Sequence, residues 1–289
     1  SSAELEMAYH EMAVNAGISM MPSEIYETDG NKNFITKRFD RDRERKLHTQ
    51  TLAAISPETE SYEGLIAVCR KLHLPESDCQ EVFRRLVFNI LSNNTDDHTK
   101  NFSFIMDETG KWRLSPAYDL TYIIDAGGYL PNTGHCMYVR AKLHNISYDD
   151  AIEFAKDNGI RRADSIIQAV VGSLKQFRTI AQKYAVQDRW INTVEDAINR
   201  HLDLWGFANS NKTAVNLVIN GTQYNNVRIE QTYKGNFHLY ANINGAERKY
   251  VIGKNKSEYG LIQSIGVSNL SKDLLADMVE KFLCHSDYC

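Results

Sequence analysis

One stretch of the chain concentrates carboxylate, amide, imidazole and ammonium groups: NNTDDHTKN, residues 93–101. Such crowding costs free energy unless the side chains face water, a metal or a ligand. Asp96 and Asn101 lie five positions apart (101 minus 96), and Asp119 follows. Protein kinases use an Asp, an Asn five positions later, a β-hairpin and then a second Asp to orient the acceptor hydroxyl and to bind magnesium. The residue types and their spacing therefore favour metal-dependent phosphoryl transfer from ATP.

The elements expected around these residues support that interpretation. An Asp and an Asn at this spacing arise by chance in a chain of 289 residues, so the pair alone says little. An apolar stripe through residues 82–91, preceded by acidic and capping residues at 76–78, predicts a helix that ends near Asn93. Residues 102–106 and 111–114 flank an acidic turn with glycine, a pattern typical of a β-hairpin, and Asp119 comes after it. A helix, a loop, a hairpin and an Asp in this order arise by chance much more rarely than the Asp–Asn pair alone.

Composition excludes several classes of protein. Lysine and arginine number 33 against 37 acidic residues, so the net charge of -4 gives no electrostatic support for nucleic-acid binding. No apolar run approaches the roughly 20 residues needed to span a membrane, and no signal-peptide pattern opens the chain, so we expect a cytoplasmic protein. The five cysteines are spread without metal-ligand spacing, which predicts free thiols.

The rest of the chain predicts an α+β protein of two parts. Helical patterns cover residues 5–16, 47–55, 61–72, 148–158, 163–184 and 188–205, and strands are expected at 22–26, 33–36 and 135–140. Beyond residue 209 the pattern changes to strands at 214–219, 227–232, 236–242 and 248–252, followed by one helix over 271–283. We therefore expect a helix-dominated part over residues 1–208, and a small antiparallel sheet with one helix over residues 209–289.

Two runs resemble the signature of HipA-like serine/threonine kinases, the toxins of bacterial toxin–antitoxin pairs: NTDDHTKNFS at residues 94–103 and RLSPAYDL at residues 113–120. The segment KRFDR at residues 37–41 is similar to the hinge of that family. The resemblance extends through the helices to about Gly206 and covers about two thirds of the chain. It implies a protein-kinase-like fold dominated by a helical lobe.

The resemblance also implies roles for individual residues of the polar stretch. Asp96 is the expected catalytic base, which accepts the proton of the acceptor hydroxyl. Asn101 and Asp119 are the expected ligands of Mg2+, and His98 and Lys100 are expected beside the phosphates. Simpler interpretations remain open for His98 and Lys100: His98 fixes the loop by hydrogen bonding, and Lys100 is a solvated charge.

The remaining implications concern the nucleotide and the partners. By resemblance, the hinge residues Lys37, Arg38, Phe39 and Asp40 contact ATP through their backbone, although charges in such a segment also suit a solvated face. Asp97 is interpreted as a residue that stabilises the loop. The implied ligands are ATP and Mg2+, and the implied partners are a protein substrate and a HipB-like antitoxin.

Two parts of the family pattern do not occur in residues 1–289: a glycine-containing phosphate loop with a regulatory serine, and a strand lysine that grips the ATP phosphates. The chain opens directly on a helical pattern and has no initiator methionine, so we expect these parts upstream or on a separate N-terminal chain. Residues 47–52 lack the family's acidic pair, and residues 209–289 match none of its pattern.

The sequence is compatible with three functions. The motifs favour an ATP- and magnesium-dependent protein serine/threonine kinase. The missing phosphate loop and lysine favour a catalytically silent, kinase-like binding module that acts through a partner chain. A small-molecule kinase is the third, because the loop chemistry does not determine the acceptor.

Overall fold

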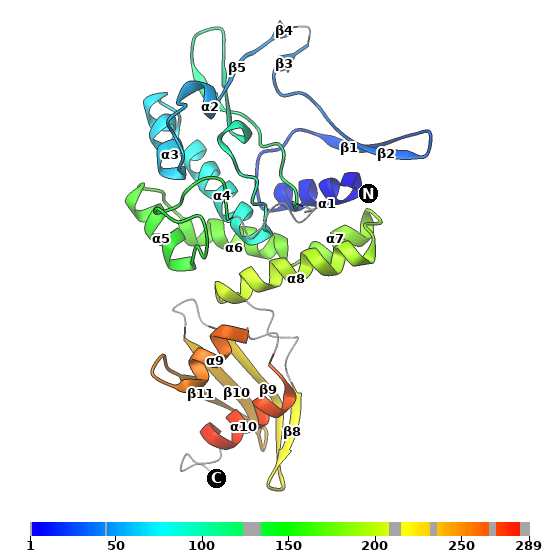
Figure 1. The fold of residues 1–289 in the computed structure, drawn as a ribbon, viewed down its shortest axis with the longest axis vertical. Coiled ribbons are helices and arrows are strands. Elements are labelled where there is room, and N and C mark those ends of the chain that lie inside the picture. Colours follow the sequence, from blue (N-terminus) through cyan, green and yellow to red (C-terminus); the bar gives the residue numbers. More distant parts are fainter. Residues whose placement is uncertain are drawn as a thin grey trace. The chain divides into compact units, whose positions relative to one another are not determined.

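The computed structural model describes residues 2–43, 45–123, 134–207, 215–231, 236–265 and 270–283. Contacts divide the chain into two compact units, Ser1–Ile198 and Asn199–Cys289, which are described separately (Figure 1). The division falls inside the long helix α8 (Asp188–Leu204). The boundary near residue 209, expected from the change in sequence pattern, stays a prediction. Both helices and strands are present, as the sequence predicted.

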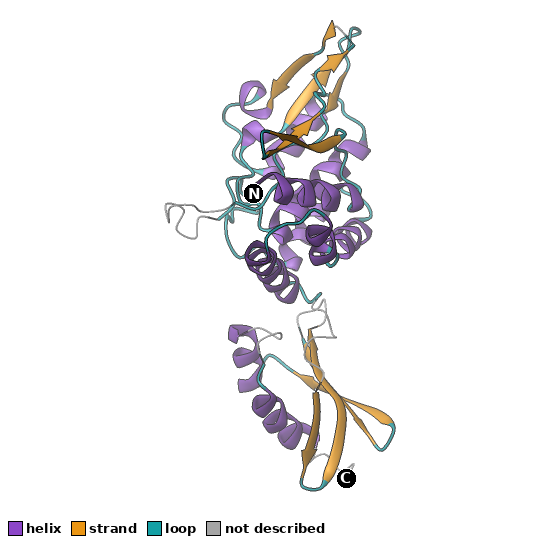
Figure 2. Ribbon diagram, turned by 90° about the vertical axis from the view of Figure 1, so that its right-hand side faces the viewer, coloured by secondary structure: helices purple, strands orange, loops and turns teal. Residues whose placement is uncertain are grey.

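Helices dominate the first unit, and its strands gather at one end of it (Figure 2). Before α8 the helices are α1 (Ser2–Asn15), α2 (Leu52–Ile55), α3 (Tyr62–Lys71), α4 (Glu76–Ser92), α5 (Tyr148–Asp157), α6 (Ala163–Leu174) and α7 (Phe177–Lys183). The strands are β1 (Ser23–Thr28), β2 (Asn31–Thr36), β3 (Arg41–Asp42), β4 (Arg45–Lys46), β5 (His48–Thr51), β6 (Ser103–Met106) and β7 (Trp112–Leu114). Across the described residues of both units, no helix is long and apolar enough to cross a membrane.

The helix α4 carries the chain into the polar stretch. Its apolar stripe is buried, with Val82, Phe83 and Leu86 fully inaccessible, and it packs against α6 and α3. The helix ends at Asn93, whose backbone adopts the left-handed conformation that commonly stops a helix (φ 58°). The expected helix and its end are therefore confirmed.

The strands form short antiparallel ladders. β1 pairs with β2 through a turn at Asp29 and Gly30, both with positive φ (51° and 75°), which suits a two-residue hairpin. β5, β6 and β7 form a three-stranded sheet in that order, and β3 pairs with β4. Phe104 of β6 pairs with Gln50 on one side and with Leu114 on the other. The hairpin expected at residues 102–114 is confirmed.

Three expectations for the first unit were wrong. Residues 47–55 are not one helix, because β5 pairs with β6, far along the chain, before the short α2 begins. The helix expected over residues 163–184 is interrupted between α6 and α7 at Lys175 and Gln176, where no Gly or Pro marks a break. Residues 135–140 make isolated bridges, including one between Ser61 and Tyr138, instead of a strand.

The second unit contains an antiparallel sheet of β8 (Val215–Ile219), β9 (Thr222–Gln231), β10 (Phe237–Ile243) and β11 (Ala246–Ile252), in the order β11-β10-β9-β8. Two helices, α9 (Ser257–Ile265) and α10 (Lys272–Leu283), cover one face of it (Figure 2). The expectation of one helix here was wrong. Tyr259 and Ile262 of α9 join the core of the sheet and α10. Two apolar anchors in a helix of nine residues give a weak periodic signal, which explains why the sequence did not indicate it.

Candidate active site

The polar stretch at residues 93–101 folds into a loop that is braced from within. Thr99–Asn101 form the short 3-10 helix η1, and the backbone nitrogen of Asn101 donates to the His98 carbonyl at 2.9 Å. The side-chain nitrogen Nδ2 of Asn101 donates to the Asp96 carbonyl at 2.8 Å. Because the side-chain nitrogen is used in this way, Oδ1 of Asn101 is left to accept from, or bind to, a ligand. The five-residue spacing thus lets the Asn side chain hold the loop that carries the Asp.

The Asp96 carboxylate is exposed, with 53% of its side chain accessible. Its Oδ1 lies 3.8 Å from Nε2 of His98 and 4.0 Å from the thiol sulfur of Cys136. The other ring nitrogen of His98, Nδ1, is buried and has no hydrogen-bond partner among the described residues. An exposed carboxylate in such a position can accept a proton from a bound hydroxyl.

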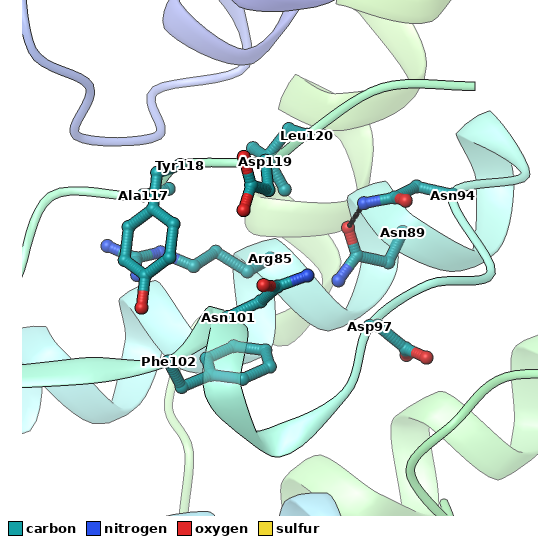
Figure 3. A pocket seen from close by; sticks show the side chains of 10 residues that line it. All are labelled: Arg85, Asn89, Asn94, Asp97, Asn101, Phe102, Ala117, Tyr118, Asp119 and Leu120. Carbon is teal, nitrogen blue, oxygen red and sulfur yellow. Dashed lines mark hydrogen bonds between the residues drawn. The ribbon is translucent and has the colours of Figure 1, made fainter. Parts of the chain in front are cut away.

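A small pocket lies between this loop and the segment that follows β7 (Figure 3). It is lined by Arg85, Asn89, Asn94, Asp97, Asn101, Phe102, Ala117, Tyr118, Asp119 and Leu120. In Figure 3 the Asp119 carboxylate and the Asn101 amide point into the same space. Asp96, His98 and Lys100 do not line this pocket. The structure therefore brings the two expected metal ligands together and leaves the expected base and phosphate neighbours outside their pocket.

A second carboxylate, Glu6 of α1, lies close enough to Asp119 to interact with its charge. Burial, and then the negative charge of Asp119, raises the pKa of Glu6 above its usual value. A cation bound at Asp119 would reduce this repulsion between like charges. Sequence reasoning missed Glu6, because a single acidic residue in an amphipathic helix has the signature of a surface position.

Tyr118 fastens the segment that carries Asp119 to the loop. Its hydroxyl donates to the Lys100 carbonyl at 2.7 Å and also contacts the Ser103 hydroxyl. Burial is the main cause that raises the pKa of Tyr118, so the phenol stays a hydrogen-bond donor. The contact uses the backbone of Lys100, whose side chain is exposed. Tyr118 is half-buried, and its hydroxyl holds the segment that carries Asp119 against the loop.

The hinge-like segment adjoins the site through Phe39. The Phe39 ring stacks on Tyr118, with centroids 5.5 Å apart and an interplanar angle of 24°. Arg38 and Asp40 instead pair with one another through two hydrogen bonds of 2.8 and 2.7 Å, and the Arg38 guanidinium lowers the pKa of Asp40. The backbone nitrogen of Lys37 already donates to the carbonyl at position 22. Phe39 thus contacts the pocket wall through its side chain.

Asp97 belongs to a buried polar network that sequence reasoning indicated only in part. Its Oδ2 accepts from the Tyr62 hydroxyl at 2.7 Å, and that hydroxyl accepts from Nδ2 of Asn89 at 3.0 Å. Asn94 in turn donates to Oδ1 of Asn89 at 3.0 Å. The loop-stabilising interpretation of Asp97 agrees with these contacts. The partners were missed because they come from α3 and α4, and no local spacing connects them.

Comparison with known protein families assigns the part of the chain that contains this loop and pocket. Residues 1–178 match the model of the HipA-like C-terminal domain. The chain belongs to this family.

The relatives of this HipA-like chain carry kinase names. A Sinorhizobium fredii protein named "Putative kinase Y4mE" is 21% identical over 217 residues, which cover 68% of this chain and 51% of that protein. A Haemophilus influenzae protein named "Putative kinase" is 25% identical over 210 residues, which cover 60% of each protein. This HipA-like chain therefore spans less than two thirds of the length of these relatives.

A solved structure shares the fold. The Shewanella oneidensis MR-1 toxin–antitoxin complex of HipA, HipB and operator DNA contains a chain that matches with a TM-score of 0.56 and 17% identity. The match covers 68% of this HipA-like chain and 55% of the Shewanella chain. At this identity the likeness shows the fold alone.

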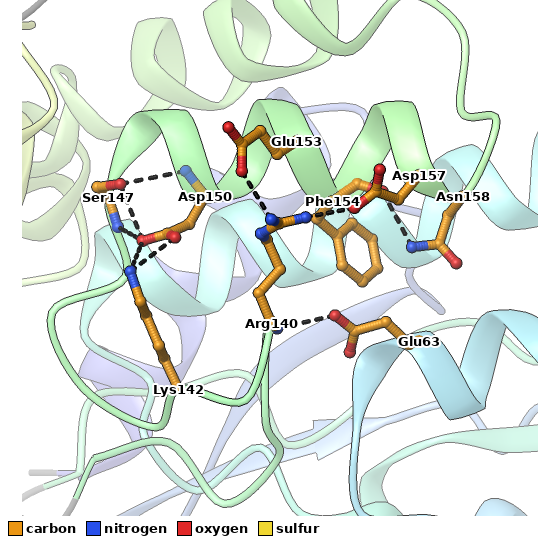
Figure 4. A network of polar contacts seen from close by, with 9 residues as sticks. All are labelled: Glu63, Arg140, Lys142, Ser147, Asp150, Glu153, Phe154, Asp157 and Asn158. Carbon is orange, nitrogen blue, oxygen red and sulfur yellow. Dashed lines mark hydrogen bonds and ion pairs between the residues drawn. The ribbon is translucent and has the colours of Figure 1, made fainter.

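In this HipA-like chain, the segment at residues 134–147, after the pocket, is fastened to α3 and α5 (Figure 4). The backbone nitrogen of Arg140 donates to Glu63 of α3. The Arg140 guanidinium pairs with Glu153 and Asp157 of α5. Lys142 donates to both carboxylate oxygens of Asp150 at 2.7 and 2.8 Å. These contacts explain how a segment without strands keeps a defined position. Residues 124–133 lie outside the described residues.

Proposed function

We propose that the HipA-like region is the catalytic part of an ATP- and magnesium-dependent protein serine/threonine kinase, with a protein-kinase-like fold. One observation carries the proposal: Nδ2 of Asn101 holds the Asp96 carbonyl while the same side chain shares a pocket with Asp119. The Asn101 side chain, itself a proposed metal ligand, thereby links the proposed base Asp96 to the second proposed metal ligand, Asp119. The kinase names of the relatives support the reaction class.

In this proposal Asp96 is the catalytic base. Its carboxylate is exposed, so an acceptor hydroxyl can reach it, and its backbone is fixed by Asn101. A base must lie within about 2.6–3.2 Å of the proton that it accepts, which an exposed carboxylate on a braced loop allows. His98, near Asp96, and the exposed Lys100 are proposed to face the phosphates from outside the pocket.

The residues of the pocket fit Mg2+ better than a metal held entirely by protein. Within the described ranges, no group of three or more His, Cys, Asp and Glu side chains could hold a metal ion. Mg2+ usually binds through one or two carboxylates and keeps waters and substrate phosphates as its other ligands. Asp119 and Oδ1 of Asn101 are the proposed protein ligands, and the bound ion would supply charge neutralisation at the phosphates.

The nucleotide is proposed to lie along the segment Lys37, Arg38, Phe39 and Asp40. Phe39 is proposed to set the distance between this segment and the metal ligands, because its ring stacks on the residue before Asp119. The phosphate loop and lysine of the family are proposed to lie in sequence outside residues 1–289, upstream or on a separate N-terminal chain. The Shewanella neighbour assembles with HipB, and a HipB-like antitoxin is the proposed partner here.

A catalytically silent binding module is the second candidate, favoured by the two missing ATP-binding parts. Transfer of radioactive phosphate from ATP, with Mg2+, to a heat-inactivated bacterial extract separates the two. Asp96→Asn should reduce transfer by about 100-fold or more and leave the unfolding temperature unchanged, because Asp96 is exposed. The matched control is Asp29→Asn, in an exposed turn whose positive φ suits Asn. Transfer that persists in Asp96→Asn refutes the assigned base. No transfer by the unmodified chain, when it is assayed together with the proposed phosphate-loop and lysine parts, refutes the kinase.

A further inference from the structure

We propose that the turn at His135 and Cys136 is the acceptor-side wall of the active site, and that Asp97 is the positioning residue that holds this wall against Asp96. The proposal rests on the proposed kinase function. It concerns where the protein substrate enters, and it gives Asp97 a task that differs from that of its neighbour Asp96.

Both oxygens of the Asp97 carboxylate accept hydrogen bonds from protein donors. Its side chain is inaccessible, and Oδ2 accepts from the Tyr62 hydroxyl at 2.7 Å and from Nδ1 of His135 at 3.0 Å. Oδ1 accepts from the backbone nitrogen of Cys136 at 2.7 Å. A buried charge needs such partners, because an unpaired one is costly. In Figure 3 the Asp97 carboxylate points away from the space that Asn101 and Asp119 share.

These contacts exclude other roles for Asp97. A carboxylate that accepts three hydrogen bonds inside the protein is not free to take a substrate proton or to bind a metal in this conformation. Two of the three donors belong to consecutive residues, His135 and Cys136, so the carboxylate fixes both the side chain and the backbone of this turn. Asp97 therefore sets the position of residues that are 38 and 39 positions away in the sequence.

The position of this turn decides what can reach Asp96. The thiol sulfur of Cys136 lies 4.0 Å from Oδ1 of Asp96, which is van der Waals distance. An acceptor hydroxyl that approaches Oδ1 of that carboxylate from the side of the turn would lie against Cys136. The turn is held a second time at Tyr138, whose backbone nitrogen and oxygen bond to Glu60 and Tyr62. The wall is fixed by the fold and does not depend on a bound acceptor.

Cys136 has the properties of a wall and not of a nucleophile. Cys136 is exposed, and partial burial of its thiol, followed by the charges of Asp97 and Asp96, raises the pKa of that thiol to about 11. The reactive thiolate is therefore scarce at neutral pH. A small side chain at this place leaves room for an acceptor, and a large one would occupy the space beside Asp96.

The holding role of Asp97 can be tested without any enzymatic activity. Alkylation of the full chain by iodoacetamide, with peptide mapping to follow Cys136 alone, reports how firmly the turn is held. Asp97→Asn should accelerate alkylation by at least about 10-fold, because it frees the turn and removes a charge that suppresses the thiolate. Glu195→Gln, which breaks an ion pair with Arg178 elsewhere in the unit, should not change the rate. An unchanged rate in Asp97→Asn overturns the holding role.

The position of the wall is tested by placing a large side chain at residue 136. Cys136→Trp should reduce phosphate transfer to the extract proteins by at least about 10-fold, with affinity for magnesium–ATP unchanged in titration calorimetry. Val14→Trp, at an exposed position of α1, is the matched control. N-ethylmaleimide applied to the folded, unmodified chain should cause the same loss, which separates blocking from misfolding. In Cys136→Ser the reagent should have no effect, which excludes reaction at other cysteines.

The outcomes separate the two proposals. If Asp96→Asn abolishes transfer but Cys136→Trp transfers at the unmodified rate, the kinase stands and the wall is refuted. If the unmodified chain transfers no phosphate even together with the proposed phosphate-loop and lysine parts, the kinase is refuted and the wall with it, while the alkylation rates still decide whether Asp97 holds the turn. A loss of ATP affinity in Cys136→Trp equal to its loss of transfer also refutes an acceptor-side position.

Discussion

Removal of the Tyr62 hydroxyl tests the buried network that holds the active-site loop. The hydroxyl donates to Asp97 at 2.7 Å and accepts from Asn89 at 3.0 Å, and Tyr62 is 1% exposed. In Tyr62→Phe the ring remains, with its edge-to-face contact to Phe102, so only the volume of one oxygen atom is lost. A hydrogen bond to a charged group contributes about 1.5–3 kcal/mol and a neutral one about 0.5–1.5 kcal/mol. We therefore expect the free energy of unfolding to fall by about 2–4 kcal/mol.

Urea unfolding followed by tryptophan fluorescence measures this change. Of the three tryptophans, Trp112 and Trp190 belong to the first unit, which contains Tyr62, and Trp205 belongs to the second. Tyr26→Phe is the matched control, since Tyr26 is 56% exposed, and we expect it to change the free energy by less than about 0.5 kcal/mol. A loss below about 1 kcal/mol in Tyr62→Phe, with the same dependence on urea, would show that these two hydrogen bonds do not stabilise the loop.

The two remaining predictions concern charge. Burial acts to raise the pKa of Asp150, but Lys142 and Ser147 outweigh it, so the folded-state pKa is below the usual value. The ionised Asp150 carboxylate therefore stabilises the folded state fully above about pH 4, and this contribution is lost as the pH falls through the lowered pKa. Asp150→Asn should lower the free energy of unfolding by about 1–3 kcal/mol at pH 7. Urea unfolding at several pH values should show this difference shrinking toward about pH 3. Alkylation of Cys136 should keep accelerating up to a pH of about 11, where burial and then Asp97 place its pKa, and a plateau near pH 8 in peptide mapping would contradict this.

The elements around the polar loop were predictable because their signals are local. The helix α4 has a long apolar stripe and ends at a residue, Asn93, that tolerates a left-handed backbone. The hairpin of β6 and β7 is marked by a turn with Asp107 and Gly110 between two apolar runs. By contrast, β5 has four residues and becomes a strand by pairing with β6, so its sequence alone resembles the start of the following helix.

The residues of the candidate site also fall into those with a local sequence signal and those without one. The motif spacing indicated Asn101 and Asp119, which line one pocket, because the spacing itself arises from a contact within the loop. Tyr62 and His135 were not indicated, although both bind Asp97, because they lie 35 residues before it and 38 residues after it. Hydrogen bonds between such distant residues depend on the packing of whole helices, which no single-sequence pattern encodes.

The backbone at Asp119 gives an argument for its role that is independent of the motif. Its φ of 54° is left-handed, a conformation that glycine adopts freely and other residues adopt at a cost of about 1 kcal/mol or more. The segment just before Asp119 is held by two hydrogen bonds: the backbone nitrogen of Ala117 donates to the Ser19 carbonyl at 2.7 Å, and Arg85 donates to the Ser115 carbonyl at 2.8 Å. Glycine would relieve the strain but would supply no carboxylate. Asp29 has a similar φ of 51° in an exposed turn, so the left-handed backbone at Asp119 supports a functional role only together with the place of its carboxylate in the pocket beside Asn101.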